Sequence, residues 1–385
     1  MGDTFLGYRR SNGQVGCRNN IGIISIMDNV NPVTRAIADA VAGALAVTTL
    51  FVRGQYGKDL EVSYATLAGM GCNPNLYGVV IVGMERTSTN IVADRVRKTG
   101  KPVETVLIQE LGGTIAATAD GISKAAKMAI AASRLRREPI PVSELILGLE
   151  CGGSDTTSGL AGNPALGRAT DRLIAQGATA IVTETAEFLG AEEIFAEQAI
   201  NEEVKKAFLK MVLDHEAIAM QSGVDIRGAN PVPDNIRGGL TTIEEKALGA
   251  MAKAGTTPLV AVLEYSDAPT QKGLHFMAGC APAVESLTGL AAGGCQICVF
   301  TTGVGNTIGN MIMPTAKISG NINTIRNFTD NIDFDVSDIL EKDMPIAEAG
   351  DALYEYILEM ASGTVTTSEA LKQQETAISR YGMTI

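Results

Sequence analysis

Ile21-Gly-Ile-Ile-Ser-Ile-Met27 and Gly78-Val-Val-Ile-Val-Gly83 are two short apolar runs rich in β-branched residues. Strands of a parallel sheet have such sequences because helices cover both faces of the sheet. Three further runs of the same kind follow, at residues 180–183, 258–263 and 296–301. Together the five runs predict an α/β fold with mainly parallel sheets flanked by helices.

Amphipathic stretches between these runs predict helices over residues 32–46, 123–137, 165–176 and 192–221. Alternating strands and helices are typical of βαβ units. The segment Arg134-Leu-Arg-Arg-Glu-Pro-Ile-Pro141 interrupts the alternation, and its charges and prolines predict an exposed connector. We therefore predict two domains, an N-terminal α/β domain over residues 1–138 and a Rossmann-like catalytic α/β domain over residues 139–385.

The composition limits the possible partners. Of the 385 residues 45% are hydrophobic and 19% charged, which excludes intrinsic disorder. The net charge of -12 argues against a surface for nucleic acid or anionic lipid, and no apolar run approaches the roughly 20 residues that span a bilayer. The six scattered cysteines indicate buried thiols or ligands rather than disulfides. We expect a cytoplasmic protein without nucleic-acid or membrane partners.

The segment Leu147-Gly-Leu-Glu-Cys-Gly-Gly-Ser-Asp155 ends a predicted strand with a thiol, two glycines, a hydroxyl and a carboxylate. In parallel sheets ligands collect at the carboxyl ends of strands. Cys151, Ser154 and Asp155 therefore indicate metal or carboxylate binding, and the alternative is a tight turn with a helix cap.

Glu184 and Glu187 follow another predicted strand, in Thr183-Glu-Thr-Ala-Glu187. Two carboxylates in this place can hold a divalent cation or act as acid and base. The alternative is that they only complement the dipole of the helix that follows.

The glycine-rich loop at residues 301–309 can bind an anion through backbone N–H groups, but it lacks the glycine spacing of NAD-binding and ATP-binding loops. Only two histidines are present, which argues against a histidine-rich metal site or a Ser-His-Asp triad. His215 lies in a predicted helix and is expected at the surface. His275 precedes a Gly/Pro turn, which fits either a catalytic or ligand role or a structural hydrogen bond.

Many ordered motifs resemble the altronate/galactarate dehydratase family over nearly the whole chain. The matching residues are Gly7-Tyr-Arg-Arg10 with Gly13, Gly16, Arg18 and Asn19; Ile108-Gln-Glu-Leu-Gly-Gly-Thr114; Arg137-Glu-Pro139; Leu147 to Asp155; Asn163-Pro-Ala-Leu-Gly167; Thr183 to Glu187 with Gly190-Ala-Glu192; Gly239-Leu-Thr-Thr-Ile-Glu-Glu-Lys246; Glu285-Ser-Leu-Thr-Gly289; and Phe300-Thr-Thr-Gly303. The resemblance implies that residues 1–138 form the family's second-domain type.

The resemblance also implies a metal-assisted lyase that removes the proton α to a carboxylate, expels the β substituent and yields a 2-keto acid. The expected cofactor is a divalent metal, Fe²⁺ before Mn²⁺ or Mg²⁺. Full-length relatives carry an N-terminal β-clip (SAF-type) domain, whereas here the first family motif starts at residue 7, so a separate small subunit and a hetero-oligomer are expected. The implied roles are catalysis for Lys246, His275 and Glu110, substrate binding for Arg18, Ser154, Thr302 and Lys317, and metal binding for Cys151, Asp155, Glu184 and Glu187.

Departures from the family pattern bear on the substrate. Segments where the dehydratases carry thiols read Phe51-Val-Arg-Gly-Gln-Tyr-Gly-Lys-Asp59 and Gly83-Met-Glu-Arg-Thr87. They place Arg53, Lys58 and Arg86 where neutral groups are expected, and guanidinium groups suit a sulfonate or a second carboxylate.

A doubly anionic 2-hydroxy acid follows as the substrate hypothesis, with (2R)-sulfolactate losing sulfite to give pyruvate, and Arg53 and Arg86 are assigned to substrate binding. Three alternatives stay open: cations that merely occupy surface loops, dehydration of altronate or a hexarate, and a non-catalytic scaffold that binds an acid or a partner subunit.

Overall fold

The computed structural model describes residues 2–50, 52–221, 223, 230–380, 382 and 384. The N-terminal domain is built on an all-parallel sheet in the order β4-β3-β5-β6. Helices α1 and α4 pack on one face and α2 and α3 on the other, as the two apolar clusters of this domain show. Its elements are β3 (Asn20–Ser25), α1 (Asn31–Ala40), β4 (Ala44–Val47), α2 (Gly57–Cys72), β5 (Leu76–Gly83), α3 (Arg86–Arg97), β6 (Val103–Leu107) and α4 (Thr114–Ala132).

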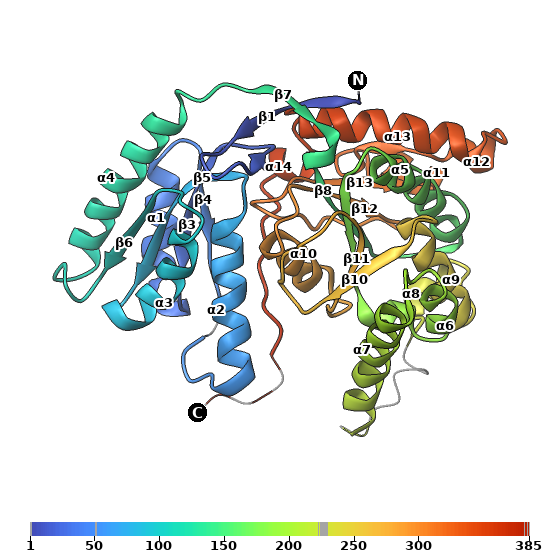
Figure 1. The fold of residues 1–385 in the computed structure, drawn as a ribbon, viewed down its shortest axis with the longest axis horizontal. Helices are drawn as coiled ribbons and strands as arrows, with labels where there is room; N and C mark the ends of the chain where they lie inside the picture. The colour runs from blue at the N-terminus through green and yellow to red at the C-terminus, as the bar shows by residue number, and fades with distance from the viewer. Residues whose placement is uncertain are drawn as a thin grey trace.

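The C-terminal domain contains a seven-stranded, all-parallel sheet in the order β10-β11-β9-β8-β12-β13-β14. Helices α5, α7 and α13 cover one face, and α10 covers the other (Figure 1). The strands are β8 (Ile146–Cys151), β9 (Thr179–Val182), β10 (Leu259–Leu263), β11 (Gly273–Met277), β12 (Ile297–Thr301), β13 (Thr315–Ser319) and β14 (Phe334–Asp335). The helices are α5 (Asn163–Ala175), α6 (Glu192–Ala196), α7 (Glu202–Gln221), α8 (Pro233–Arg237), α9 (Ile243–Met251), α10 (Ala283–Ala292), α11 (Ile322–Asn327), α12 (Asp338–Glu341), α13 (Ile346–Ala361) and α14 (Thr367–Ala370).

A third, antiparallel sheet joins the domains at one edge of the molecule (Figure 1). It consists of β2 (Val15–Gly16), β1 (Thr4–Arg9) and β7 (Glu138–Pro141), with β1 in the middle. The connector predicted over residues 134–141 therefore ends in a strand. Its prolines are tolerated because β7 pairs with one neighbour only, and Ile140 between them points into the core.

The two domains share an apolar boundary. Helix α2 packs against α10, and Ala292, Met311 and Ile312 of the C-terminal domain belong to the same buried cluster as the core side of α2. Asn73 donates from Nδ2 to the carbonyl oxygens of Ala291 at 2.8 Å and Cys295 at 2.9 Å. This packing fixes the position of one sheet relative to the other.

The α/β class with mainly parallel sheets is confirmed, and each of the five predicted runs forms a strand shifted by at most two residues. The helix expected over residues 32–46 is wrong in its second half. Helix α1 ends at Ala40, Gly43 adopts a left-handed conformation with a φ of 76°, and residues 44–47 form edge strand β4. The helix expected over residues 192–221 is divided into α6 and α7, and α4 runs from Thr114 to Ala132 rather than over 123–137. Within the described chain, no helix is both long and apolar enough to cross a membrane.

Candidate functional site

Three ionisable side chains meet in the interior at the carboxyl ends of β8 and β9. Cys151 is the last residue of β8, Glu184 follows β9, and Lys253 lies in a short 3-10 helix (Ala252–Ala254) that continues α9. Lys253 Nζ lies 2.5 Å from Glu184 Oε2 and 2.9 Å from Cys151 Sγ. All three side chains are almost completely buried. They form a compact acid–thiol–lysine cluster.

The backbone holds Glu184 in this cluster. Its φ of 76° lies in the left-handed region, which costs free energy for a residue with a Cβ atom. Glu184 Oε2 accepts a hydrogen bond from the Cys151 backbone N–H at 3.2 Å, and the Cys151 thiol lies 3.4 Å from the same oxygen. The end of β8 and the loop after β9 therefore constrain one carboxylate from two sides.

Burial dominates the electrostatics of the cluster. It raises the pKa of Cys151, and the Glu184 carboxylate raises it further, so the thiol stays protonated at neutral pH. Burial also raises the pKa of Glu184, while the Lys253 ammonium opposes that shift. For Lys253 burial favours a lower pKa, but the Glu184 carboxylate in contact with it opposes that shift and the pKa is raised. Lys253 is therefore the cation of the cluster.

Glu150, beside Cys151 on β8, is fully buried, and neither carboxyl oxygen has a hydrogen-bond partner among the described residues. Burial and then the nearby Glu184 raise its pKa well above the usual value. Glu150 is therefore protonated and neutral. The positive charge of Lys253 then balances the negative charge of Glu184 in this part of the core.

A second acid–lysine pair lies further along the same loop. Glu187 Oε1 lies 2.9 Å from Lys246 Nζ, and the ammonium also donates to Asn230 Oδ1 at 2.7 Å. Helix α9 carries Lys246 and begins after Thr242, whose side chain accepts a hydrogen bond from the Glu245 N–H. The second carboxylate oxygen of Glu187 is buried without a partner among the described residues. The pair thus retains one unused acceptor, which is able to take a proton.

Lys246 also lines a cavity of about 240 Å³ at the end of β8, together with Ser154 and Asp155. Asp155 additionally borders a more open cavity of about 640 Å³. Its Oδ1 accepts from the Ser158 N–H at 3.1 Å, and its Oδ2 accepts from Asn321 Nδ2 at 2.7 Å. The structure therefore brings Ser154, Asp155 and Lys246 to one cavity, with Glu187 behind Lys246.

The glycine-rich loop at residues 301–309 packs against Asp155. A Cβ atom at Gly303 would lie 2.2 Å from the Asp155 carboxylate, so only glycine fits there. Thr302 is buried, donates its N–H to the Ile318 carbonyl and accepts the Gly305 N–H at its hydroxyl. Its contacts are those of a turn-forming residue within the loop.

Of the four predicted metal ligands, only Cys151 and Glu184 lie together, with the thiol 3.4 Å from Glu184 Oε2. Glu184 binds Lys253, Glu187 binds Lys246, and Asp155 is hydrogen-bonded to its own loop and Asn321. In the part of the chain that the structure describes, no three His, Cys, Asp or Glu side chains form a metal-binding group. A divalent ion between Cys151 and Glu184 would have to displace an ammonium group that already contacts both. This donor set does not fit a divalent metal.

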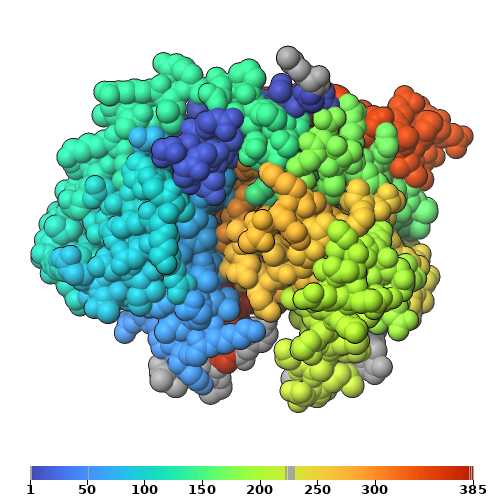
Figure 2. All heavy atoms as spheres, in the orientation of Figure 1, coloured from blue at the N-terminus to red at the C-terminus, as the bar shows by residue number. Residues whose placement is uncertain are grey.

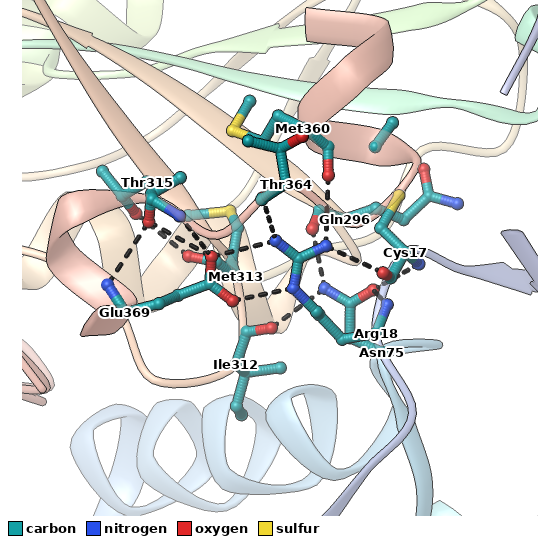
Figure 3. Close-up of polar contacts among 12 residues, drawn as sticks. Cys17, Arg18, Asn75, Gln296, Ile312, Met313, Thr315, Met360, Thr364 and Glu369 are labelled. Carbon is teal, nitrogen blue, oxygen red and sulfur yellow. Dashed lines mark hydrogen bonds and ion pairs between the residues drawn. The ribbon is translucent and has the colours of Figure 1, made fainter. Parts of the chain in front are cut away.

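Arg18, predicted to bind substrate, lies at the junction between the domains (Figure 3). It binds both carboxylate oxygens of Glu369, at 2.7 and 2.9 Å. It also donates to the carbonyl oxygens of Cys17, Met360 and Thr364. All five guanidinium N–H groups therefore have protein partners, and none is left for a substrate anion in this arrangement.

Lys317, also predicted to bind substrate, is fully buried on β13. Its ammonium donates to Ser368 Oγ at 2.5 Å and to Gln373 Oε1 at 3.3 Å. Because burial outweighs the nearby Asp333, its pKa is lowered to about 8. The contacts connect the sheet to the C-terminal segment.

Three other predicted residues lie in the N-terminal domain, away from Lys246. Arg86 and Glu110 follow β5 and β6 and form an ion pair at the surface, with side chains 65% and 44% exposed. Arg53 is exposed in the turn before α2. Arg86 and Glu110 thus pair with each other and not with a residue of either acid–lysine pair.

His275 lies within β11 and is fully buried. Its Nδ1 is 3.1 Å from the Gly273 carbonyl, and its Nε2 has no partner among the described residues. Burial lowers its pKa, so the ring is neutral at pH 7. Among the described residues, no hydrogen bond or ion pair joins His275 to either acid–lysine pair.

Sequence reasoning missed Lys253 altogether. The residue stands in Ala250-Met-Ala-Lys-Ala-Gly255, where small and apolar neighbours surround a single charge. A lysine in such a context was the only available signal, because its two partners lie 102 and 69 positions away in the chain.

These features define a two-domain α/β protein whose buried acid–lysine pairs line the carboxyl edge of a parallel sheet. Comparison with known families gives the particular assignment. Residues 142–384 match the model of the D-galactarate/altronate dehydratase C-terminal domain, and residues 7–133 match that of the D-galactarate dehydratase/altronate hydrolase second domain. The chain belongs to the D-galactarate/altronate dehydratase family.

Individual relatives cover nearly the whole chain. The (2R)-sulfolactate sulfo-lyase subunit beta of Chromohalobacter salexigens is 42% identical over 383 residues, which are 98% of this chain and 98% of that protein. The altronate dehydratase of Bacillus subtilis is 32% identical over 99% of this chain and 78% of its own length. The galactarate dehydratase (L-threo-forming) of Escherichia coli is 32% identical over 95% of this chain and 74% of its own length.

Proposed function

We propose that the chain is the catalytic subunit of a lyase that eliminates sulfite from (2R)-sulfolactate and releases pyruvate. The observation that carries the proposal is the buried Lys246–Glu187 pair, in which Lys246 lines the Ser154–Asp155 cavity and Glu187 lies directly behind it, because the pair combines a base and a cation. The end-to-end similarity to a sulfolactate sulfo-lyase subunit supports this choice of leaving group.

In the proposed reaction Glu187 Oε2 takes the proton from C2 of a substrate that reaches past Lys246, the member of the pair that lines the cavity. The Lys246 ammonium offsets the negative charge that develops on the substrate carboxylate. The C3–S bond then breaks, and sulfite leaves with the bonding electron pair. The enol that remains takes up a proton at C3 and becomes pyruvate, so the overall reaction converts one sulfolactate into one pyruvate and one hydrogen sulfite.

Ser154 and Asp155 position the substrate in this scheme. Hydrogen bonds from its own loop and from Asn321 hold the Asp155 side chain, so its position in the cavity wall is fixed. The cavity of about 240 Å³ has room for a three-carbon acid. Preorganised groups of this kind reduce the entropy lost on reaching the transition state.

A requirement for a divalent metal stays a prediction, and no step above depends on one. A second, small subunit is part of the proposal, since the similar sulfo-lyase chain is named as a subunit and the similar altronate dehydratase has about a fifth of its length unmatched by this chain. We therefore propose a hetero-oligomer with a β-clip subunit.

The test is an anaerobic assay of the chain with its partner subunit, with Fe²⁺, Mn²⁺, Mg²⁺ or no metal, on sulfolactate and altronate in parallel. We expect sulfite and pyruvate in equal amounts from sulfolactate and none of either from Lys246→Met. A Lys206→Met variant, changed at an exposed lysine of α7, serves as the control and should retain activity.

The second candidate function is dehydration of altronate, which the 32% identity to two altronate dehydratases favours. Keto acid from altronate without sulfite from sulfolactate would establish it in place of the first. Absence of turnover with both substrates, partner and metals would instead indicate a non-catalytic subunit.

A further inference from the structure

The loop at residues 230–239 is attached to the wall of the proposed active-site cavity. It lies in the chain between α7, which projects at the lower edge of the molecule in yellow-green (Figure 2), and α9. Asn235 is buried and donates from Nδ2 to the Ser154 carbonyl at 2.8 Å. The Gly238 carbonyl accepts from the backbone N–H and from the hydroxyl of Thr156, at 3.1 and 2.9 Å. Ser154 and Thr156 line the cavity of about 240 Å³, so these contacts fix the loop to the cavity wall.

Asn230, at the start of this loop, bridges both members of the acid–lysine pair. Its Oδ1 accepts from Lys246 Nζ at 2.7 Å, and its Nδ2 donates to Glu187 Oε1 at 3.4 Å. An ammonium group only donates hydrogen bonds and a carboxylate only accepts them. Turning the amide group over would direct its N–H groups at the ammonium and its oxygen at the carboxylate. The Asn230 bridge therefore has one favourable orientation.

The bridge also decides which atoms of the pair stay available. Lys246 has three N–H groups, and Glu187 and Asn230 accept two of them, so the contacts among the described residues leave one for a group in the cavity that Lys246 lines. Lys246 and Asn230 both bind Oε1 of Glu187, whereas Oε2 is buried with no partner in the described part of the chain. The unbound oxygen is the one that takes the proton in the proposed reaction.

Asn230 reaches the substrate only through these two neighbours. Its side chain is half-buried, and it stands outside the described lining of the cavity of about 240 Å³. Lys246, by contrast, is part of that lining. A change at residue 230 should therefore alter the direction of the catalytic groups more than the space that the substrate occupies.

We propose that Asn230 is a positioning residue of the lyase reaction: its amide group fixes the direction of the Lys246 ammonium and keeps Glu187 Oε2 free to accept the proton. This inference rests on the proposed function, which assigns proton transfer to the Lys246–Glu187 pair. Groups held in the reactive geometry before the substrate arrives lower the entropic part of the barrier. Loss of the bridge therefore slows the chemical step.

Steady-state kinetics with sulfolactate and the partner subunit test the proposal in two variants. Asn230→Leu keeps the approximate size of the side chain and removes both hydrogen bonds. Asn230→Asp keeps the shape and the acceptor for Lys246 but directs a second carboxylate at Glu187. We expect each variant to lower kcat about tenfold to a hundredfold, the scale of a misplacement of about 1 Å, and to leave KM within about threefold. Asn327→Leu, at an exposed asparagine of α11, is the matched control and should retain kcat.

Circular dichroism of the same samples measures the folded fraction. A fall in kcat in fully folded Asn230→Asp supports the positioning role, because a purely structural residue acts through the folded fraction alone. Two results would overturn the proposal: a kcat within twofold of the unchanged enzyme in both variants, or a loss of kcat that only follows the loss of folded protein.

Urea titration, which needs no turnover, separates this inference from the proposed function. Asn230→Leu should shift the unfolding midpoint of the unchanged chain. The shift should be less than half as large in a Lys246→Met, Glu187→Gln background, which has neither the ammonium nor the carboxylate of the bridge. Equal shifts in both backgrounds would overturn the inference even in an active enzyme. Unequal shifts in a chain that turns over neither sulfolactate nor altronate would overturn the proposed function and confirm the bridge.

Discussion

The carboxyl edges of the two parallel sheets carry the same kind of ion pair in different surroundings. In the N-terminal domain Arg86 and Glu110 follow β5 and β6, and their side chains are 65% and 44% exposed. In the C-terminal domain Lys253 and Glu184 are 0% and 2% exposed, and Lys246 and Glu187 are 9% and 7% exposed. Topology thus places charged residues at both edges, but only one edge excludes water from them.

The exclusion of water changes what an ion pair can do. An exposed pair contributes about 0–1 kcal/mol, because water and salt screen it. In a buried pair each partner depends on the other, and removing one leaves an uncompensated charge that costs about 3–5 kcal/mol. The second edge is therefore where both chemistry and large mutational effects are expected.

The largest expected effect is on catalysis at Glu187. Glu187→Gln keeps the shape of the side chain but removes its ability to take a proton. We expect kcat/KM to fall by about 10²–10⁴-fold, the usual range for loss of a general base. Steady-state assays of sulfite release measure it, with Glu193→Gln, an exposed acid on α6, as control. Activity within twofold of the unchanged enzyme would remove Glu187 from the mechanism.

Lys253→Met should produce the largest loss of stability. Glu184 would remain buried beside Glu150 without its cation, so the free energy of unfolding should fall by about 3–5 kcal/mol in urea titrations. Adding Glu184→Gln to Lys253→Met should recover part of that loss, since the second change removes the orphaned charge. A double variant as unstable as the sum of both single variants would show that the pair acts through packing alone.

Lys317 sharpens the comparison, because it is a buried lysine whose hydrogen-bond partners, Ser368 and Gln373, are neutral. Its pKa falls from 10.5 to about 8 on folding, so between these values the unfolded chain binds more protons and this residue makes stability rise with pH. The unfolding free energy of the unchanged chain minus that of Lys317→Met should increase by about 3 kcal/mol from pH 8 to pH 10.5. A difference that is flat over this range would contradict the assignment.

Arg18→Lys tests the junction between the domains. Lysine keeps the charge but cannot make the paired contacts to Glu369 together with three carbonyl contacts. We expect a loss of about 2 kcal/mol, in line with charge-assisted hydrogen bonds that are partly buried. Thermal unfolding should also separate into two transitions, one for each domain. A single unshifted transition would mean that the α2–α10 contact alone holds the domains together.

The sequence predicted the sheets well, because buried parallel strands are continuous apolar runs such as residues 78–83. It failed where local composition and tertiary pairing disagree. Alanine-rich residues 44–47 have the composition of a helix but pair as edge strand β4, and two prolines did not prevent residues 138–141 from pairing with β1. In both places long-range pairing overrides the local preference.

The candidate site was predictable only in part. Cys151, Glu184 and Glu187 were found because polar residues that directly follow an apolar strand are conspicuous. The pairing of each carboxylate with its own lysine was not, since Lys253 and Lys246 come from a helix far along the chain and nothing local links them. The same motif matching also selected Arg18, whose five donors are used inside the protein.

The smallest expected effects are those of Arg86→Ala and Glu110→Gln. Because water screens this pair, each variant should change the free energy of unfolding by less than about 1 kcal/mol. Each should also leave kcat/KM for sulfolactate within about threefold, equivalent to less than 1 kcal/mol of transition-state stabilisation. Raising the salt concentration should reduce even the small stability effect. If either variant instead lost activity as Glu187→Gln does, the N-terminal edge would belong to the active site, because only contact with the substrate can give an exposed pair so large an effect.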